Sequence, residues 1–196
     1  MASLTRKSIM ESFIRLLDER PLNKISVKDI VEDCGINRNT FYYHFTDIPA
    51  LVEEIVRDEA DHIVLTAEGI SSLEECVDAA MRLSREHRRA IWHIYNSANR
   101  AIYERYLLAI CGHVVKAFID NVAGDRDISD EDRSIIIQGY KCELFGLITD
   151  WLGHGMPEDM EARFLRLCEL RRGMTEELIE RAARNREQAT GNREKE

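Results

Sequence analysis

The sequence predicts an all-α fold in which a small N-terminal head of three helices precedes a larger helical body. Apolar residues recur three and four positions apart in one segment after another, which is the spacing of helices that bury one face. These segments begin at helix-capping residues such as Ser26, Asn37 and Ser129, and several end near Gly or Pro. We expect the head over residues 1–46, the body over 47–183 and a disordered tail over 184–196, which is nearly devoid of apolar residues.

Composition and charge restrict the classes of partner. A chain of 196 residues with 44% apolar and 32% charged residues can bury a globular core, although its net charge of −9 disfavours a polyanionic partner. The charge is uneven, because residues 1–46 hold seven Lys or Arg against six Asp or Glu. The head is therefore the part suited to a polyanion. No apolar run reaches the roughly 20 residues of a membrane span, so we expect a cytoplasmic protein without a membrane partner.

The first helix is expected to begin at Ser3 or Thr5 and to end at Pro21, which cannot continue a helix. Its apolar face is formed by Ile9, Phe13, Leu16 and Leu17. Arg6 and Lys7 lie at its exposed start. There they either reach DNA or belong to a disordered leader that contacts nothing.

Residues 25–51 have the pattern of a helix, a tight turn and a second helix. Ser26 is a good cap for the first of these helices, and Gly35 supplies the left-handed residue that ends it. Asn37 caps the second helix, in which Phe41 and Phe45 lie four residues apart and face inward. The remaining residues of the second helix are left on outward surfaces.

The outward residues have side chains that suit DNA. Arg reads guanine, Asn reads adenine, the Thr methyl group contacts thymine, and Tyr or His donates to phosphate oxygens. A solvated helix face is the alternative, but it does not explain three adjacent ring residues on so short a helix. The predicted DNA-binding residues are Ser26, Lys28, Asn37, Arg38, Asn39, Thr40, Tyr42, Tyr43 and His44.

The run from Thr40 to Phe45, followed by a cap at Thr46 or Asp47 and by Leu51, resembles the TetR family of one-component transcriptional regulators. The similarity covers residues 5–56. It implies a homodimer on a double-stranded DNA operator, with recognition helices ~34–36 Å apart and a body that takes a small molecule. The resemblance implies repression of transcription, because most members of the family block promoters. The C-terminal helices are similar in arrangement to those of regulators of dihydroxyacetone metabolism, and such relatives activate instead.

One position departs from the family pattern. The family commonly has a Lys at the start of the linking helix as a phosphate contact, where this chain has Ile48 and Pro49. The replacement predicts weaker operator affinity and a flatter dependence on salt, without a change in the bases that are read.

The body is expected to contain a linking helix over residues 48–68 and further helices over 73–83, 88–97, 100–122 and 131–152, then one opened by Pro157 and one capped by Thr175. Aromatic rings and hydroxyl groups on these helices predict a cavity for a small apolar or aromatic ligand. The alternative is that the rings fill the core. The predicted ligand-binding residues are Trp92, Tyr95, Tyr103, Tyr106, Tyr140 and Leu144.

The helix over residues 131–152 is apolar on two sides. One stripe contains Tyr140 and Leu144, and the other consists mostly of small residues that allow another helix to approach closely. We assign the small stripe to a second copy of the chain, with the helix after Pro157 beside it. The alternative is that both stripes pack within one chain. The predicted dimer residues are Gly139, Cys142, Gly146, Phe164 and Leu167.

No motif in the sequence indicates catalysis. There is no nucleophile elbow or phosphate-binding glycine loop, and no two of the six His residues lie four apart, so we expect no enzyme, cofactor or metal site. The five Cys residues lie far apart and are expected to be small buried apolar residues, with a redox sensor as the alternative. The second functional hypothesis is a helical interaction module or coactivator that works through a protein partner.

Overall fold

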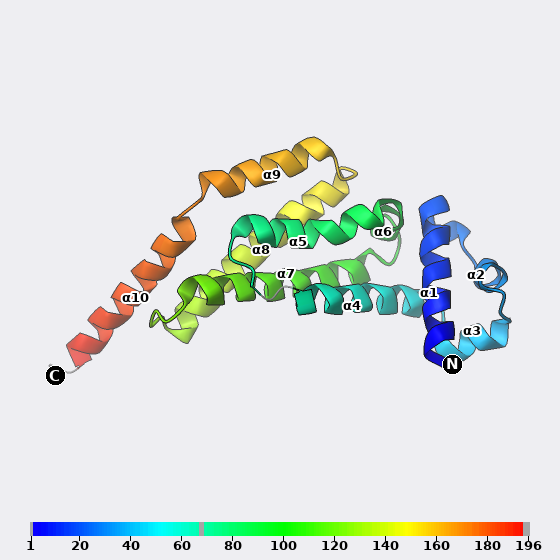
Figure 1. Cartoon of the computed structure of the whole chain (residues 1–196), viewed down its shortest axis with the longest axis horizontal. Coiled ribbons are helices and arrows are strands. Elements are labelled where there is room, and N and C mark those ends of the chain that lie inside the picture. The colour runs from blue at the N-terminus through cyan, green and yellow to red at the C-terminus, as the bar shows by residue number, and fades with distance from the viewer. Residues whose placement is uncertain (1, 67–68, 194–196) are drawn as a thin grey trace. The chain divides into compact units, whose positions relative to one another are not determined.

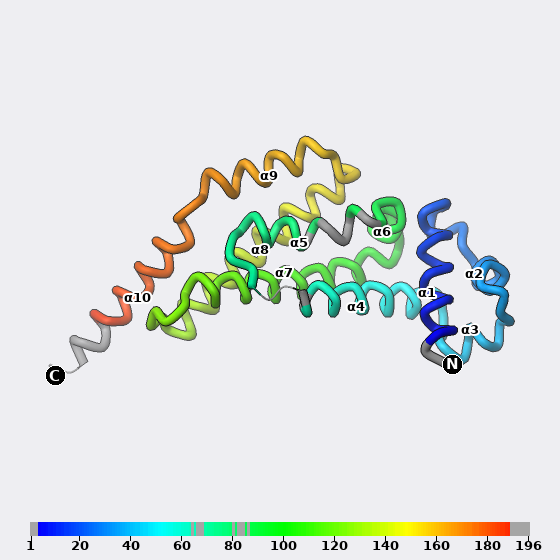
Figure 2. Tube along the Cα trace, viewed as in Figure 1, coloured from blue at the N-terminus to red at the C-terminus, as the bar shows by residue number. Residues whose placement is uncertain are grey.

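The computed structural model describes residues 2–66 and 69–193, and every regular element in this part of the chain is helical (Figure 1). The expected all-α class is confirmed. The elements are α1 (Ala2–Glu19), a 3-10 turn η1 (Leu22–Lys24), α2 (Val27–Cys34), α3 (Arg38–His44), α4 (Ile48–Thr66), α5 (Leu73–Glu86), α6 (Arg88–Tyr95), α7 (Arg100–Ala123), α8 (Asp130–Gly153), α9 (Glu158–Leu170) and α10 (Met174–Arg193). Figure 2 traces the same path along the Cα atoms. The expected last residues of the linking helix, 67 and 68, lie outside the described range.

The chain folds into two compact units, and α4, α5 and α7 each contribute to both. The first unit is Met1–His62 with Arg82–Leu107, and the second is Ile63–Met81 with Leu108–Glu196. The first unit is larger than the head over residues 1–46 that we expected. It is larger because α1 packs against α6 as well as against α2.

The core of the first unit is organised around α1. Ile9, Phe13 and Leu17 of α1 are completely buried, as are Ile30 of α2 and Phe41 of α3. Polar groups support this packing where the helices meet. The buried Ser12 donates its hydroxyl to Asp33 Oδ2 at 2.6 Å, which ties α1 to α2.

The core of the second unit is formed by long helices and contains few buried polar side chains. Val114 and Ile119 of α7 and Ile148 of α8 are completely buried, and Trp151 is buried with its indole N–H donated to the Pro157 carbonyl at 3.2 Å. Three of the Cys residues, Cys76, Cys111 and Cys168, lie in this core, whereas Cys142 is exposed and Cys34 is half-buried. The expectation that all five are buried is therefore wrong for Cys142, because it lies on the outward stripe of α8.

Burial changes the chemistry of the core thiols. It raises the pKa of Cys76 and of Cys111 to about 12 and the pKa of Cys168 to about 11. Because the thiolate is the reactive species, these three thiols are unreactive near neutral pH. A redox role for them is disfavoured.

The C-terminal segment differs from our expectation of disorder from residue 184, because α10 continues as a helix to Arg193. Its sequence is rich in Glu, Arg and Ala, which are strong helix formers. Pairs four residues apart add support, with Arg181 Nη2 at 3.1 Å from Glu177 Oε1 and Arg184 Nη1 at 3.8 Å from Glu180 Oε2. Arg186 also contacts Asp127 at 2.9 Å. The polar part of α10 after residue 184 thus continues a helix whose apolar residues, such as Ile179, lie in its first half.

α7 is the one helix in the described residues that is long and apolar enough to cross a membrane by length and composition alone. Buried residues along it, including Leu107, Val114 and Phe118, face the cores of the two units. The core helix of a globular protein passes the same test, so this observation is weak evidence for a membrane span.

Candidate nucleic-acid interface

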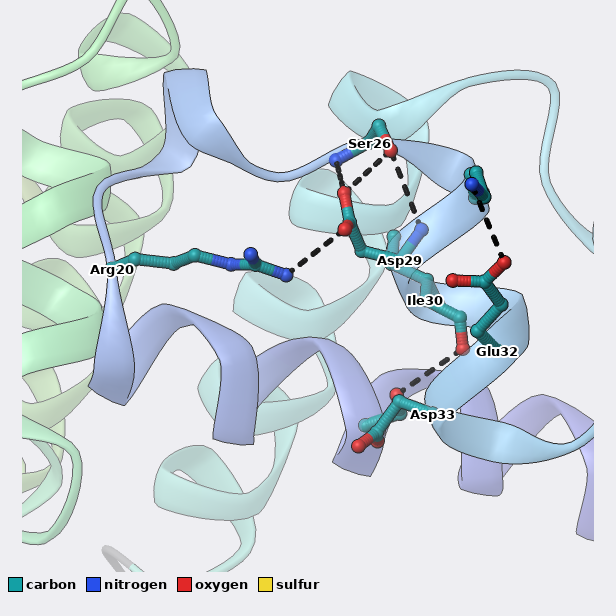
Figure 3. A network of polar contacts seen from close by, with 8 residues as sticks. Arg20, Ser26, Asp29, Ile30, Glu32 and Asp33 are labelled. Atoms are coloured by element: carbon teal, nitrogen blue, oxygen red, sulfur yellow. Dashed lines mark hydrogen bonds and ion pairs between the residues drawn. The ribbon is translucent and has the colours of Figure 1, made fainter.

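α2 begins at a complete capping box (Figure 3). The Ser26 hydroxyl accepts the Asp29 N–H at 3.3 Å, and the Asp29 carboxylate accepts the Ser26 N–H at 2.8 Å. Gly35 ends the helix with φ at +66°, in the left-handed region that a side chain disfavours. The predicted cap and stop signals are both confirmed, and together they fix the turn that precedes α3.

Two carboxylates hold α2 against the end of α1. Hydrogen bonds from Ser26 lower the pKa of Asp29, and Arg20, whose Nη2 lies 3.2 Å from Asp29 Oδ1, lowers it further (Figure 3). Hydrogen bonds from Ser12 and then Arg15 lower the pKa of Asp33. Both carboxylates are therefore ionised near neutral pH. α2 is held by charge as well as by its apolar stripe.

α3 exposes one face and anchors the other. Phe41 is completely buried and Phe45, directly after the helix, is 5% exposed, whereas Tyr42 is 54% and Tyr43 is 79% exposed. The Asn37 side chain accepts the Thr40 N–H at 2.9 Å and caps the helix. The aromatic rings of Tyr42 and Tyr43, which are large enough to be buried in a core, are thus exposed to solvent on a helix of seven residues.

The structure brings the nine predicted DNA-binding residues together at the start of α2 and along α3. Seven of them are exposed, while Thr40 and His44 are half-buried. Ser26 and Asn37 serve as caps, so their side chains also have local structural roles. Lys28 lies 3.7 Å from Glu32 in an exposed pair of the helix surface, and Arg38 has no ion pair within residues 2–66 and 69–193.

Arg6 does not extend outward as the alternative of a DNA contact requires. It forms an ion pair with the buried Glu54 of α4, and its Cζ atom lies 5.7 Å from the centre of the Phe45 ring. Arg57 contacts the same carboxylate. Sequence reasoning missed Glu54 because the adjacent pair Glu53-Glu54 resembles an ordinary solvated helix surface.

The start of α4 is set by Asp47, one of the two residues expected to cap it. Asp47 Oδ1 accepts the Ala50 N–H at 2.8 Å. Pro49 occupies the first turn, where a missing N–H is tolerated. α3 is therefore followed by a fixed turn into α4.

The predicted ligand-binding residues are divided between the two units. Tyr95 and Tyr103 pack edge to face in the first unit with ring centres 6.2 Å apart, and Trp92 and Tyr106 are half-buried in the same unit. Tyr140 and Leu144 are buried in the second unit.

Three tyrosine hydroxyls of this set, those of Tyr95, Tyr106 and Tyr140, bond within the protein. Arg100 donates to the Tyr95 oxygen at 2.7 Å, Tyr106 donates to Glu53 at 3.1 Å, and Tyr140 lies 2.7 Å from the Thr175 hydroxyl. These bonds fit the alternative in which the rings complete the core. Of the six residues, Tyr103 lines a small apolar cavity of the first unit, about 40 Å³ in volume.

The predicted dimer residues differ in where they lie. Gly139, Cys142 and Gly146 form an exposed strip on α8, and a Cβ atom added at either glycine would meet nothing within 4 Å. Phe164 is 7% exposed and belongs to the core of its own unit, while Leu167 is half-buried.

In the part of the chain that the structure describes, no cluster of His, Cys, Asp and Glu could hold a metal ion.

Comparison with known proteins places both parts of the chain. Residues 9–55 match the profile described as "Bacterial regulatory proteins, tetR family", and residues 71–173 match that of a TetR-type "Transcriptional regulator C-terminal region". The chain is 26% identical over 98 residues to the uncharacterized HTH-type transcriptional regulator YvdT of Bacillus subtilis (strain 168). That match spans 46% of this chain and 50% of YvdT.

Solved structures share the fold. The dihydroxyacetone kinase operon activator DhaS is similar with a TM-score of 0.69 and 19% identity, over 85% of this chain and 95% of that one. A gamma-butyrolactone receptor described as ArpA-like is similar with a TM-score of 0.51 and 18% identity, over 94% and 98% of the two chains. The capped turn, the outward rings of α3 and the matches to both halves of the chain lead to one conclusion: this chain belongs to the TetR family of bacterial transcriptional regulators.

Proposed function

We propose that the chain is a cytoplasmic transcriptional repressor that binds its operator as a homodimer and releases it when a small molecule binds the C-terminal domain. The observation that carries the DNA-binding part is the exposure of Tyr42 and Tyr43 on α3, while Phe41 of the same helix is completely buried. A solvated surface does not require rings, whereas phosphate and base edges accept them.

Each predicted DNA-binding residue of α3 has a role in this proposal. Arg38 and Asn39 reach base edges in the major groove, and the Thr40 methyl group contacts a thymine. Tyr42, Tyr43 and His44 donate to phosphates, with Lys28 at the start of α2 as a further phosphate contact. Because Ile48 stands where relatives have a Lys, fewer phosphates are neutralised and the salt dependence is shallower.

The homodimer forms through the exposed face of α8. Ile135 is 62% exposed and lies on the same side of α8 as Gly139, next to a groove of about 500 Å³ that Met174 and Leu178 of α10 also line. Exposed aliphatic side chains beside glycines suit the close approach of a second helix. The proposed interface also takes in α9, where Leu167 is half-buried and Phe164 is buried in the core of its own unit.

We assign the small molecule to the apolar cavity beside Tyr103. The apolar cavity beside Tyr103 is about 40 Å³, far smaller than the roughly 300–1,000 Å³ of a typical ligand pocket, so a ligand must displace lining side chains such as Ile91 and Ile94 in order to enter. We therefore expect ligand binding to be coupled to a movement of α6.

The test of the proposal starts from DNA selected out of a random library by the full-length chain. The double variant Arg38→Ala with Tyr42→Ala should lose at least about 30-fold in affinity for the selected fragment, because each contact contributes ~1–3 kcal/mol. Arg163→Ala on α9 is the matched control, since it removes an exposed charge elsewhere. Unchanged binding by the double variant contradicts the assignment of α3. Light scattering establishes that the dimer is intact.

A second candidate function is a helical interaction module or activator that works through a protein partner. The acidic character of the residues after 46 favours it, and DhaS, which has a similar fold, is named as an operon activator. A reporter gene downstream of the selected operator distinguishes repression from activation. Loss of expression on adding the chain supports the repressor, and a gain supports the activator. No DNA shift at any salt concentration supports the protein-partner alternative.

A further inference from the structure

The end of α1 and helix α6 are joined by two hydrogen bonds. In each bond, a side chain of one helix pairs with a backbone group of the other. α6 begins at Arg88, and the preceding His87 makes no capping bond with its own side chain. The cap is supplied by α1 instead, because Asp18 Oδ1 accepts the Ala90 N–H at 3.2 Å. An acceptor at the third residue of a helix, together with a negative charge at its N-terminus, is what an ordinary N-cap provides. Here both come from a residue 72 positions away.

The second bond runs in the opposite direction. His93 Nδ1 lies 2.6 Å from the Leu17 carbonyl oxygen, and because a carbonyl only accepts, the Nδ1 atom carries the hydrogen. The helical partner of this carbonyl would be the N–H of residue 21, which is Pro21 and has none. His93 therefore satisfies a carbonyl that the sequence of α1 leaves unpaired.

The two bonds form a two-point joint. They start from adjacent residues of α1, Leu17 and Asp18, and end three residues apart on α6, at Ala90 and His93. The His87 ring adds a contact, with Nδ1 3.7 Å from Asp18 Oδ2. Two points fix the rotation of one helix against the other, which a single bond cannot do.

α1 in turn holds the DNA-binding helices. Ser12 and Arg15 both bond to Asp33 of α2 at 2.6 Å, and Arg6 lies over the Phe45 ring at the end of α3. A displacement of α1 against α6 is therefore a displacement of the helices that approach DNA. Ser12 is completely buried, so its hydroxyl bonds within the protein.

We propose that Asp18 and His93 are positioning residues for operator binding, and that their reciprocal caps link the state of α6 to the placement of α3. The inference rests on the proposed function, because it concerns the affinity for an operator. Linkage is reciprocal, so a joint through which α6 affects operator affinity must also let the operator affect α6.

The experiment measures hydrogen exchange of the peptide over residues 87–95 with and without the selected operator fragment. Operator binding should slow exchange of this peptide in the wild-type chain and in Asp18→Asn, which keeps an oxygen to accept the Ala90 N–H. The slowing should be lost in Asp18→Ala and in His93→Phe, and their operator affinity should fall roughly ten-fold, within the usual range of coupling between sites. Glu19→Ala changes an exposed neighbour and should behave as the wild type.

Several outcomes overturn the inference. One is a wild-type chain that binds the operator with no change in α6, and another is an Asp18→Ala variant that keeps both the affinity and the protection. Asp18→Asn behaving like Asp18→Ala also overturns it, because the cap would then not be the decisive bond. If Asp18→Ala fails to fold by circular dichroism, His93→Phe decides. A wild-type chain that binds no DNA refutes the proposed function, which separates that failure from a failure of the joint.

Discussion

α3 and α8 each bury one side and expose the other, but their exposed sides are opposite in chemistry. The outward side of α3 carries Arg38 and two rings with hydroxyl groups, whereas the outward side of α8 carries Ile135 and a strip of small residues. The first can donate hydrogen bonds to an anion, whereas the aliphatic and small residues of the second suit contact with another apolar surface. Exposure alone therefore does not identify a partner, whereas the types of residue that are exposed do.

The two helices also differ in how they are held. α8 has 24 residues and buries six along its length, including Leu144 and Trp151. α3 has seven residues, too few to be stable alone, and depends on its cap and on Phe41. The position of α3 therefore depends on these two anchors.

The largest effect is expected from removing that anchor. Phe41→Ala should lower the free energy of unfolding by ~3–5 kcal/mol, because it leaves a cavity where a completely buried ring now packs. Tyr43→Ala removes a ring of the same helix that is 79% exposed and should change stability by less than about 0.5 kcal/mol. Chemical denaturation measures both. Equal losses in the two variants would contradict the division of α3 into a buried and an exposed side.

A smaller effect tests the outward side of α8. Ile135→Glu should weaken the dimer at least about 30-fold, because a desolvated carboxylate from each copy replaces an aliphatic contact. Ser134→Glu adds the same charge at the next exposed position and should leave the dimer unchanged. Analytical ultracentrifugation measures the dissociation constants. An Ile135→Glu dimer as tight as the wild type would exclude this face from the interface.

The smallest effect concerns the charge that holds α2. Hydrogen bonds from Ser26 lower the pKa of Asp29 in the folded state. The carboxylate of Asp29 therefore contributes to stability at pH values above its pKa in the unfolded state, which is ~4. That contribution is lost as the pH falls through the lowered folded pKa. Asp29→Asn should therefore flatten the fall in unfolding free energy below about pH 4, and Ser26→Ala should flatten it less.

Ser129→Ala is the control for this titration. It removes the cap of α8, where the Ser129 hydroxyl accepts the Asp132 N–H at 3.0 Å, and leaves the surroundings of Asp29 intact. It should lower stability by about 1 kcal/mol without changing the part of the acid transition that belongs to Asp29. Denaturation curves between pH 6 and pH 3 give the comparison. An Asp29→Asn variant with the wild-type slope would remove Asp29 from the explanation.

The sequence alone predicts the parts of this molecule that local chemistry decides. Ser26, Gly35 and Asn37 determine the boundaries of α2 and α3 through bonds to residues three or four positions away, so the pattern predicts the turn and the outward face together. The stripe of α8 is predictable for the same reason, because helical periodicity separates its two sides.

Features that depend on distant segments could not be predicted in this way. Arg6 turns to Glu54, 48 positions along the chain, and the bond from Asp18 to α6 joins residues 72 apart. The aromatic residues assigned to a ligand are divided between two units, which periodicity within single helices does not reveal. α10 continues beyond residue 184 because ion pairs and helix propensity replace the apolar residues whose absence suggested disorder.

Photocrosslinking measures directly what the two outward faces contact. A photoreactive benzoylphenylalanine is placed at position 43 in one preparation and at position 135 in another, each irradiated with the selected operator. Position 43 should crosslink to DNA at two places about one helical turn apart, and position 135 should crosslink two protein chains to each other. DNA crosslinked from position 135, or none from position 43 while the operator is bound, would contradict the assignment of α3 to DNA and of α8 to a second copy.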